Sequence, residues 1–97
     1  MVNFWKQLAL HNKPFLALAP MEGVTDYVFR EIIAGAGKPD FFFTEFTNTE
    51  ALCSKGYGKM VQNLRYSESQ RPIVAQIWGT EPKNFYSVAR MIKDLGF

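Results

Sequence analysis

The chain has 97 residues, of which 47% are hydrophobic and 21% charged, a composition typical of a globular protein. Eleven basic and nine acidic side chains give a formal charge of +2, too small by itself to indicate a nucleic-acid-binding protein. No run approaches the roughly 18 apolar residues of a membrane span, so we expect no membrane partner. One cysteine and an N-terminus without a secretory core favour a cytoplasmic protein, and the length favours one small domain over residues 1–97.

The first predicted strand covers residues 15–19, a short apolar run between two prolines that is typical of a strand buried on both faces. A turn and then a helix follow, and Thr25 or Asp26 is expected to cap the helix. The helix has an apolar face formed by Val28, Phe29, Ile32, Ile33 and Ala36. Gly37, in a left-handed conformation, and Pro39 are expected to end it.

The second predicted strand covers residues 40–46, which are rich in aromatic and β-favouring side chains. Residues 48–53 are expected to form a short helix. The stretch 54–71 is polar and contains two glycines, so we expect it to cross the surface, with a small hairpin over residues 61–66.

A third predicted strand, residues 72–78, leads into a second amphipathic helix. Thr80 is expected to cap this helix and Pro82 to lie in its first turn, where a missing N–H costs nothing. The apolar stripe of this helix is formed by Phe85, Val88, Ala89, Ile92 and Leu95. Gly96 is expected to end the helix.

This order of elements indicates an α/β fold with a parallel sheet. One interpretation is that the chain is the N-terminal portion, about three β/α units, of a parallel (β/α)8 TIM barrel, which takes about 250 residues. The alternative is a complete small α/β domain with a three-stranded sheet. The periodicity favours neither.

Polar residues follow the predicted strands, where parallel α/β folds gather their chemistry. Residues 20–23 follow the first strand, Thr44 and Glu45 end the second, and Gln76 lies near the end of the third. A buried glutamine or carboxylate needs partners, and a polar ligand at this end of the sheet would supply them.

Each of these residues also has a purely structural explanation. Gln76 could hydrogen-bond to a neighbouring loop, Glu45 could pair with a basic side chain, and Met21 could fill a gap in the core. Cys53 is expected to be a small buried apolar residue and not a nucleophile. His11 is expected to be a solvated surface residue, and its spacing indicates no metal site.

Residues 19–26, Ala-Pro-Met-Glu-Gly-Val-Thr-Asp, with Phe-Arg at 29–30, resemble the N-terminal signature of the tRNA-dihydrouridine synthases. Thr-Glu at 44–45 and Val-Ala-Gln-Ile-Trp-Gly at 74–79 match the ends of the second and third strands of that family, in the same order. An Ala-Pro-Met opening also occurs in other flavin-dependent barrels, but the three elements together are fairly specific. The resemblance extends from about residue 15 to residue 97.

The resemblance implies a TIM barrel that binds FMN, accepts hydride from NADPH and reduces specific uridines of tRNA to dihydrouridine. It implies that Pro20, Met21 and Glu22 line the isoalloxazine ring, Glu22 through its main chain, and that Gln76 hydrogen-bonds to the polar edge of the ring. The catalytic cysteine of the family lies in an Asn-x-Gly-Cys-Pro motif, which is absent from this sequence, and Cys53 does not inherit its role. We therefore expect no catalytic residue, no phosphate-binding loop and no activity from the chain alone.

Two other functions remain open. One is a different FMN-dependent barrel oxidoreductase, similar to the dihydroorotate dehydrogenases. The other is a non-catalytic α/β interaction module. If the chain is a piece of a barrel, unpaired strand edges and an apolar face are expected to make it self-associate.

Overall fold

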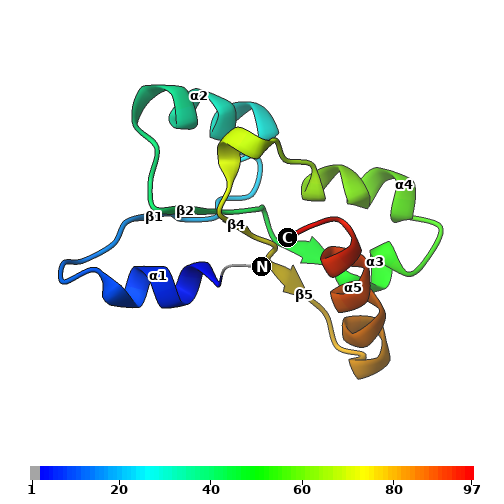
Figure 1. The fold of residues 1–97 in the computed structure, drawn as a ribbon. Coiled ribbons are helices and arrows are strands. Elements are labelled where there is room, and N and C mark those ends of the chain that lie inside the picture. Colours follow the sequence, from blue (N-terminus) through cyan, green and yellow to red (C-terminus); the bar gives the residue numbers. More distant parts are fainter. Residues whose placement is uncertain (1–2) are drawn as a thin grey trace.

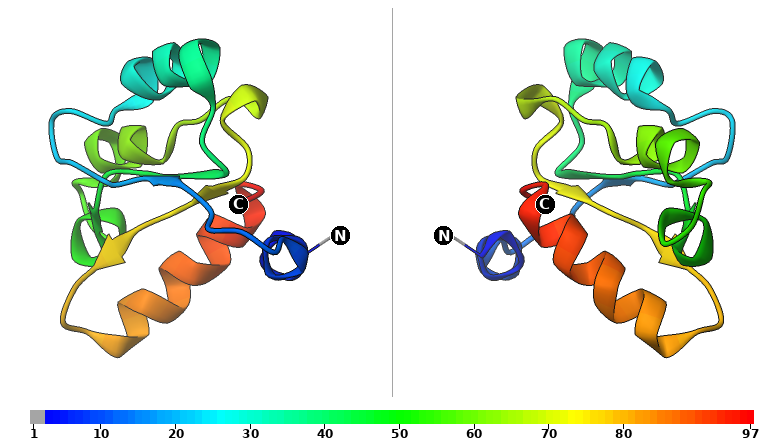
Figure 2. Two further views of the ribbon diagram at one scale, coloured as in Figure 1. Left: turned by 90° about the vertical axis from the view of Figure 1, so that its left-hand side faces the viewer. Right: turned by 90° about the vertical axis from the view of Figure 1, so that its right-hand side faces the viewer.

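The computed structural model describes residues 3–97, which form short helices around short parallel strands (Figure 1). The helices are α1 (Phe4–Leu10), α2 (Tyr27–Gly37), α3 (Thr49–Leu52), α4 (Tyr57–Met60) and α5 (Pro82–Asp94), with the 3-10 helices η1 (Val61–Leu64) and η2 (Glu68–Gln70). The strands are β1 (Ala17–Leu18), β2 (Phe41–Phe43), β3 (Thr47–Asn48), β4 (Ile73–Val74) and β5 (Ile77–Trp78). In Figure 1 and in both views of Figure 2, α2 and α5 lie on opposite sides of the strands.

The strands run parallel, as the order of the elements predicts. β2 lies between β1 and β4, and further along the chain β3 pairs with β5. Of the second predicted strand, residues 40–46, only β2 is formed; residues 44–46 are not in a strand, and β3 follows beyond the predicted range. The third predicted strand, residues 72–78, forms as β4 and β5, interrupted at residues 75–76. Both non-strand segments, 44–46 and 75–76, carry polar residues that the sequence marks as site candidates.

The first strand is more exposed than predicted. It has two residues, and the side chains of Phe15 and Leu16 before it are 48% and 72% exposed, so the expectation of a strand buried on both faces is wrong. Within residues 3–97, β1 pairs with β2 alone, and no strand pairs with its other edge. The buried residues of this sheet lie in the other two strands: Phe42 in β2 is 0% exposed and Ile73 in β4 is 5% exposed.

Helix α2 begins as predicted, with Asp26 and not Thr25 as its cap. The Asp26 carboxylate accepts a hydrogen bond from the N–H of Phe29 at 2.9 Å. The predicted apolar face is largely uncovered, since Val28 and Ile32 are 61% and 64% exposed. The residue that α2 does bury is a charged one, Arg30.

The end of α2 differs from the prediction. Gly37 is the last helical residue and does not have a positive φ. The extended residue Lys38, followed by Pro39, takes the chain out of the helix, so no left-handed residue is needed there.

Residues 57–64 are helical, so the predicted hairpin over residues 61–66 is wrong. Leu64 from η1, Leu52 from α3 and Val88 from α5 form one buried apolar cluster. That cluster requires Leu64 to turn inward from a helical segment, and this tertiary contact overrides the weak local pattern. The predicted short helix before this stretch is confirmed as α3, which Asn48 caps.

Helix α5 places Pro82 in its first turn, as predicted. The helix ends at Asp94, and Gly96, two residues later, has φ +92°, in agreement with the expectation that this glycine ends the helix. The predicted cap is wrong. Glu81 is the cap residue, without a side-chain hydrogen bond, and the hydroxyl of Thr80 instead donates to Glu50 at 2.7 Å.

Helix α1 is an element that the sequence pattern did not predict. Asn3 caps it by accepting the N–H of Trp5 at 3.0 Å, and the rings of Phe4 and Trp5 pack against Phe41 at the start of β2. Within residues 3–97, no helix combines the length and apolar character needed to cross a membrane.

Candidate ligand-binding site at the strand ends

The ends of the second and third predicted strands are held together by the backbone of Gln76. Its N–H donates to the hydroxyl of Thr44 at 3.0 Å, and its carbonyl accepts from the N–H of Thr47 at 2.9 Å. Because β1, β2 and β4 are parallel, their carboxyl ends lie at one edge of the sheet, the position where parallel α/β folds place their ligands.

The bend after β1, residues 20–25, is a tight turn in which Thr25 hydrogen-bonds back to Met21. The N–H of Met21 donates to the Thr25 hydroxyl at 2.9 Å, and the N–H groups of Val24 and Thr25 both donate to the Met21 carbonyl at 3.0 Å. Gly23 has φ +72°, a conformation that side chains disfavour. The local sequence therefore fixes the shape of this bend.

Glu45 joins the bend to the second strand. Its carboxylate accepts the N–H of Gly23 at 2.6 Å, and its side chain is only 9% exposed. The alternative in which Glu45 pairs with a basic side chain is therefore not what the structure shows, since the carboxylate bonds to backbone. A charge-assisted bond of this kind is about twice as strong as a neutral one.

Two polar groups at the strand ends are without partners. The side-chain oxygen of Gln76 is buried and has no hydrogen-bond partner within residues 3–97, so the interpretation in which it bonds to a neighbouring loop is wrong. In the bend, four of the five main-chain N–H groups of residues 21–25 donate to an acceptor, and that of Glu22 has no hydrogen-bond partner within the described chain. A buried unpaired acceptor costs about 1–3 kcal/mol, so Gln76 is suited to a ligand that donates a hydrogen bond.

The predicted site residues lie as follows. Pro20 is half-buried, Met21 is 43% exposed and Glu22 is exposed, so Met21 does not fill a core gap. Glu45 connects the bend to the interruption after β2, and Thr44, its neighbour in the chain, holds Gln76. The structure thereby links all three predicted strand ends through two adjacent residues.

Arg30 is a supporting residue whose role local patterns did not reveal. Its side chain is 1% exposed and donates to the carbonyl of Thr25 at 2.7 Å, to the side chain of Gln70 at 2.8 Å and to the carbonyl of Arg65 at 2.6 Å. Burial lowers the pKa of Arg30, and the nearby charge of Glu45 partly opposes this shift. The sequence feature that could have indicated this role is the single arginine in a largely apolar helix.

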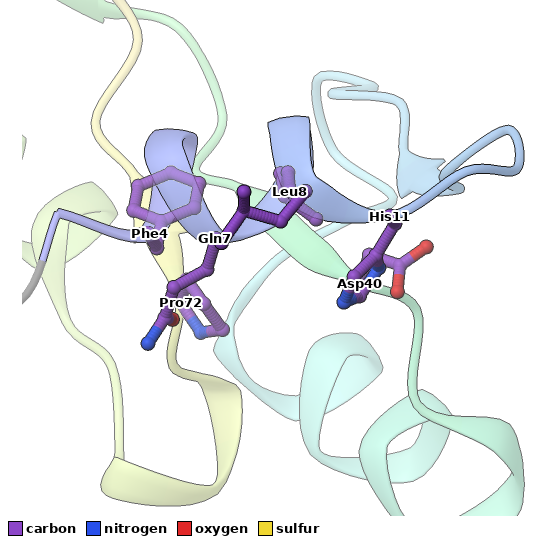
Figure 3. A pocket seen from close by; sticks show the side chains of 7 residues that line it. Phe4, Gln7, Leu8, His11, Asp40 and Pro72 are labelled. Atoms are coloured by element: carbon purple, nitrogen blue, oxygen red, sulfur yellow. The ribbon is translucent and has the colours of Figure 1, made fainter.

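Two cavities bear on the location of the site. One of about 310 Å³ adjoins the strand ends and is lined by Asp26, Tyr27, Val28, Glu45, Gln62, Asn63 and Arg65. The other, of about 480 Å³, lies at the opposite ends of the strands, between α1 and the residues that precede β2 and β4 (Figure 3). His11 and Asp40 are both among the residues that line it, and His11 is exposed as predicted.

Cys53 lies at the end of α3 and is exposed, so its predicted burial is wrong. Its sulfur lies 4.0 Å from the carbonyl oxygen of Asn84, the one polar contact that the structure gives it within residues 3–97. Nothing in this geometry connects the thiol to the strand ends.

Comparison with known proteins identifies the family. A family model described as "Dihydrouridine synthase (Dus)" matches residues 17–97. The chain is 48% identical over 96 residues to a "Probable tRNA-dihydrouridine synthase 2" of Bacillus subtilis (strain 168), covering 98% of this chain and 29% of that relative. It is 46% identical to a "Probable tRNA-dihydrouridine synthase" of Staphylococcus aureus (strain COL), again covering 98% of this chain and 28% of the relative.

The chain therefore spans less than a third of the length of these curated relatives. The family match begins at β1 and includes the bend, Glu45 and Gln76. On the strength of that match the chain belongs to the dihydrouridine synthase family.

Proposed function

We propose that the chain is the N-terminal portion, about three β/α units, of the TIM-barrel catalytic domain of a tRNA-dihydrouridine synthase. The whole protein then reduces the C5–C6 bond of specific uridines in tRNA, with NADPH as reductant, in the cytoplasm. The observation that carries the proposal is the 48% identity over nearly the whole chain to a relative of that name. The parallel order of β1, β2 and β4 supports the barrel.

We propose FMN as the cofactor, held in part by the strand ends. The isoalloxazine ring has a polar edge with an N–H donor and carbonyl acceptors. The unpartnered oxygen of Gln76 would accept from that edge, and the free N–H of Glu22 would donate to the ring. Pro20 and Met21 would contact the ring through backbone and apolar atoms, and FMN, when bound, supplies hydride transfer.

We further propose that the 97 residues alone are inactive. The sequence contains no Asn-x-Gly-Cys-Pro motif, and its single cysteine lies exposed at the end of α3. What these residues contribute is a wall that orients the flavin. The proton donor and the phosphate-binding loops would come from other parts of the protein.

The isolated chain is also proposed to self-associate. β1 has an unpaired edge within the described residues, Leu16 just before it is 72% exposed, and Val28 and Ile32 on α2 are 61% and 64% exposed. Unpaired strand edges and exposed apolar side chains favour association with a second copy.

The test of the function is a tRNA assay. The complete reading frame that contains this chain is expressed in a bacterial strain lacking dihydrouridine synthases, and dihydrouridine in its tRNA is measured by mass spectrometry. We expect the complete frame to restore dihydrouridine and the 97 residues alone to restore none. A complete frame that binds FMN but leaves tRNA unmodified would contradict the proposal and favour another flavin barrel, and one that binds no FMN would favour an interaction module.

A further inference from the structure

We propose that Glu45 is a positioning residue, whose carboxylate holds the bend after β1 so that the N–H of Glu22 is its one free main-chain donor for a ligand. The inference rests on the proposed function in one respect, namely that the ligand is FMN. It concerns a residue that does not touch the ligand and acts through the backbone of Gly23.

The hydrogen bonds of the bend support this role. The N–H groups of Met21, Val24 and Thr25 are all used within the turn itself. The N–H of Gly23 is the exception, because its acceptor lies 22 residues away, on Glu45. Without the Glu45 carboxylate, the bend would present two adjacent free donors and lose this tie to the second strand.

Glu45 is itself held rigidly enough to position another group. Its carbonyl oxygen accepts the hydroxyls of Thr44 at 3.0 Å and of Thr47 at 3.1 Å, and all three side chains are buried. The same Thr44 hydroxyl accepts the N–H of Gln76. A single segment, residues 44–47, therefore sets the position of the bend and of Gln76 together.

Arg30 supports the bend from the other side. Its guanidinium donates to the carbonyl of Thr25, the residue that closes the turn, and its charge attracts that of Glu45. The bend is thus fixed by one buried anion at Gly23 and one buried cation at Thr25. Precise placement of ligand-contacting groups requires supporting contacts of this kind.

The test uses the complete protein and three variants. In Glu45→Ala the acceptor for Gly23 is lost, and we expect FMN to bind at least about tenfold more weakly, because the lost hydrogen bond involves a charged group. Glu45→Gln keeps an acceptor oxygen and is expected to bind within about threefold of wild type. The matched control is Glu50→Ala, because Glu50 also accepts a backbone N–H across two segments, that of Thr80 at 3.1 Å, and does not touch the bend.

FMN affinity is measured by quenching of flavin fluorescence, and amide hydrogen exchange at Glu22 and Gly23 is measured in the same proteins without FMN. We expect slow exchange at Gly23 and fast exchange at Glu22 in wild type, and fast exchange at both in Glu45→Ala. Glu45→Ala with wild-type FMN affinity, or wild type with fast exchange at Gly23, would overturn the inference. If the amide of Gly23 exchanges slowly in wild type and fast in Glu45→Ala, but wild type binds no FMN, the proposed cofactor is refuted while the positioning of the bend by Glu45 still stands.

Discussion

Gly79 is a residue at which two segments approach too closely for a side chain. A Cβ atom built on it would overlap the hydroxyl of Thr49 and lie 3.4 Å from the ring of Phe85. The Thr49 hydroxyl is buried and has no hydrogen-bond partner within the described chain. This contact joins the loop after β5 to the start of α3, next to the strand ends.

We predict that Gly79→Ala destabilises the chain by about 1–3 kcal/mol, because the added methyl group forces Thr49 to move. The free energy of unfolding is measured by urea denaturation. Gly58→Ala is the control, since a Cβ there meets nothing within 4 Å, and it is expected to be neutral or stabilising by up to about 1 kcal/mol. If Thr49→Ala fails to relieve the effect of Gly79→Ala in the double variant, the steric explanation is wrong.

The sequence allowed the candidate site residues to be named as hypotheses, but it did not allow their partners to be predicted. Gln76 and the bend stand out in the sequence because they follow predicted strands of a parallel sheet, where such folds bind their ligands. The bond from Gly23 to Glu45 joins residues 22 apart, and that from Arg30 to Gln70 joins residues 40 apart. No local pattern encodes partners at such separations, so these contacts required the structure.

The carboxylate of Glu31 connects helix α2 to η2 and to the residue before it. Glu31 accepts hydrogen bonds from the side chains of Ser67, Ser69 and Gln70, the last two at 2.8 and 2.6 Å. These hydrogen bonds, of which the one from Ser67 has the largest effect, lower the pKa of Glu31 below its ordinary value of 4.5. The residue preceding it, Arg30, also bonds to Gln70, so the two elements share one polar network.

This network predicts a pH dependence of stability. A carboxylate whose pKa is lower in the folded chain stabilises the fold above its unfolded pKa, and that contribution is lost as the pH falls through the folded pKa. The melting temperature is therefore expected to fall as the pH drops from about 5 to about 3, and to fall less in Glu31→Gln. The measurement is thermal unfolding followed by circular dichroism, and an unchanged slope in Glu31→Gln would contradict the prediction.

The sequence predicted α2, α3, α5 and the parallel strands, because apolar periodicity and breakers define them locally. It failed for residues 57–64, where the burial of Leu64 against Leu52 and Val88 decides the conformation. It also failed for the cap of α5, because the hydroxyl of Thr80 is used by Glu50 instead. Both failures are cases in which a tertiary contact outweighs a local preference.

The described molecule is more extended than a compact domain of its size. Its radius of gyration is 14.1 Å, against about 13 Å for a compact chain of 100 residues. Its accessible surface of 6581 Å² exceeds the roughly 5,700 Å² expected for a compact protein of this mass. Part of the excess is apolar surface near β1 and on α2, which agrees with the proposal that further barrel units cover it.

We predict that the isolated chain is a dimer or larger by light scattering at micromolar concentration. Leu16→Lys is expected to weaken this association, because a charge beside an exposed strand edge opposes pairing. Tyr86→Lys is the control, since Tyr86 is also well exposed, at 66%, but lies on α5 away from β1. A wild-type chain that stays monomeric at all concentrations would refute the proposed self-association.

Gln76 and the bend after β1 are proposed to hold a flavin, and the FMN content of a chimera is the decisive measurement. Residues 1–97 replace the corresponding segment of the Bacillus subtilis relative, to which they are 48% identical, and bound FMN per protein is measured from its visible absorption. We expect FMN to copurify with the chimera and with Gln7→Ala, a control in the exposed part of α1, and to be largely lost in Gln76→Ala. Equal FMN content in Gln76→Ala and Gln7→Ala would contradict the account.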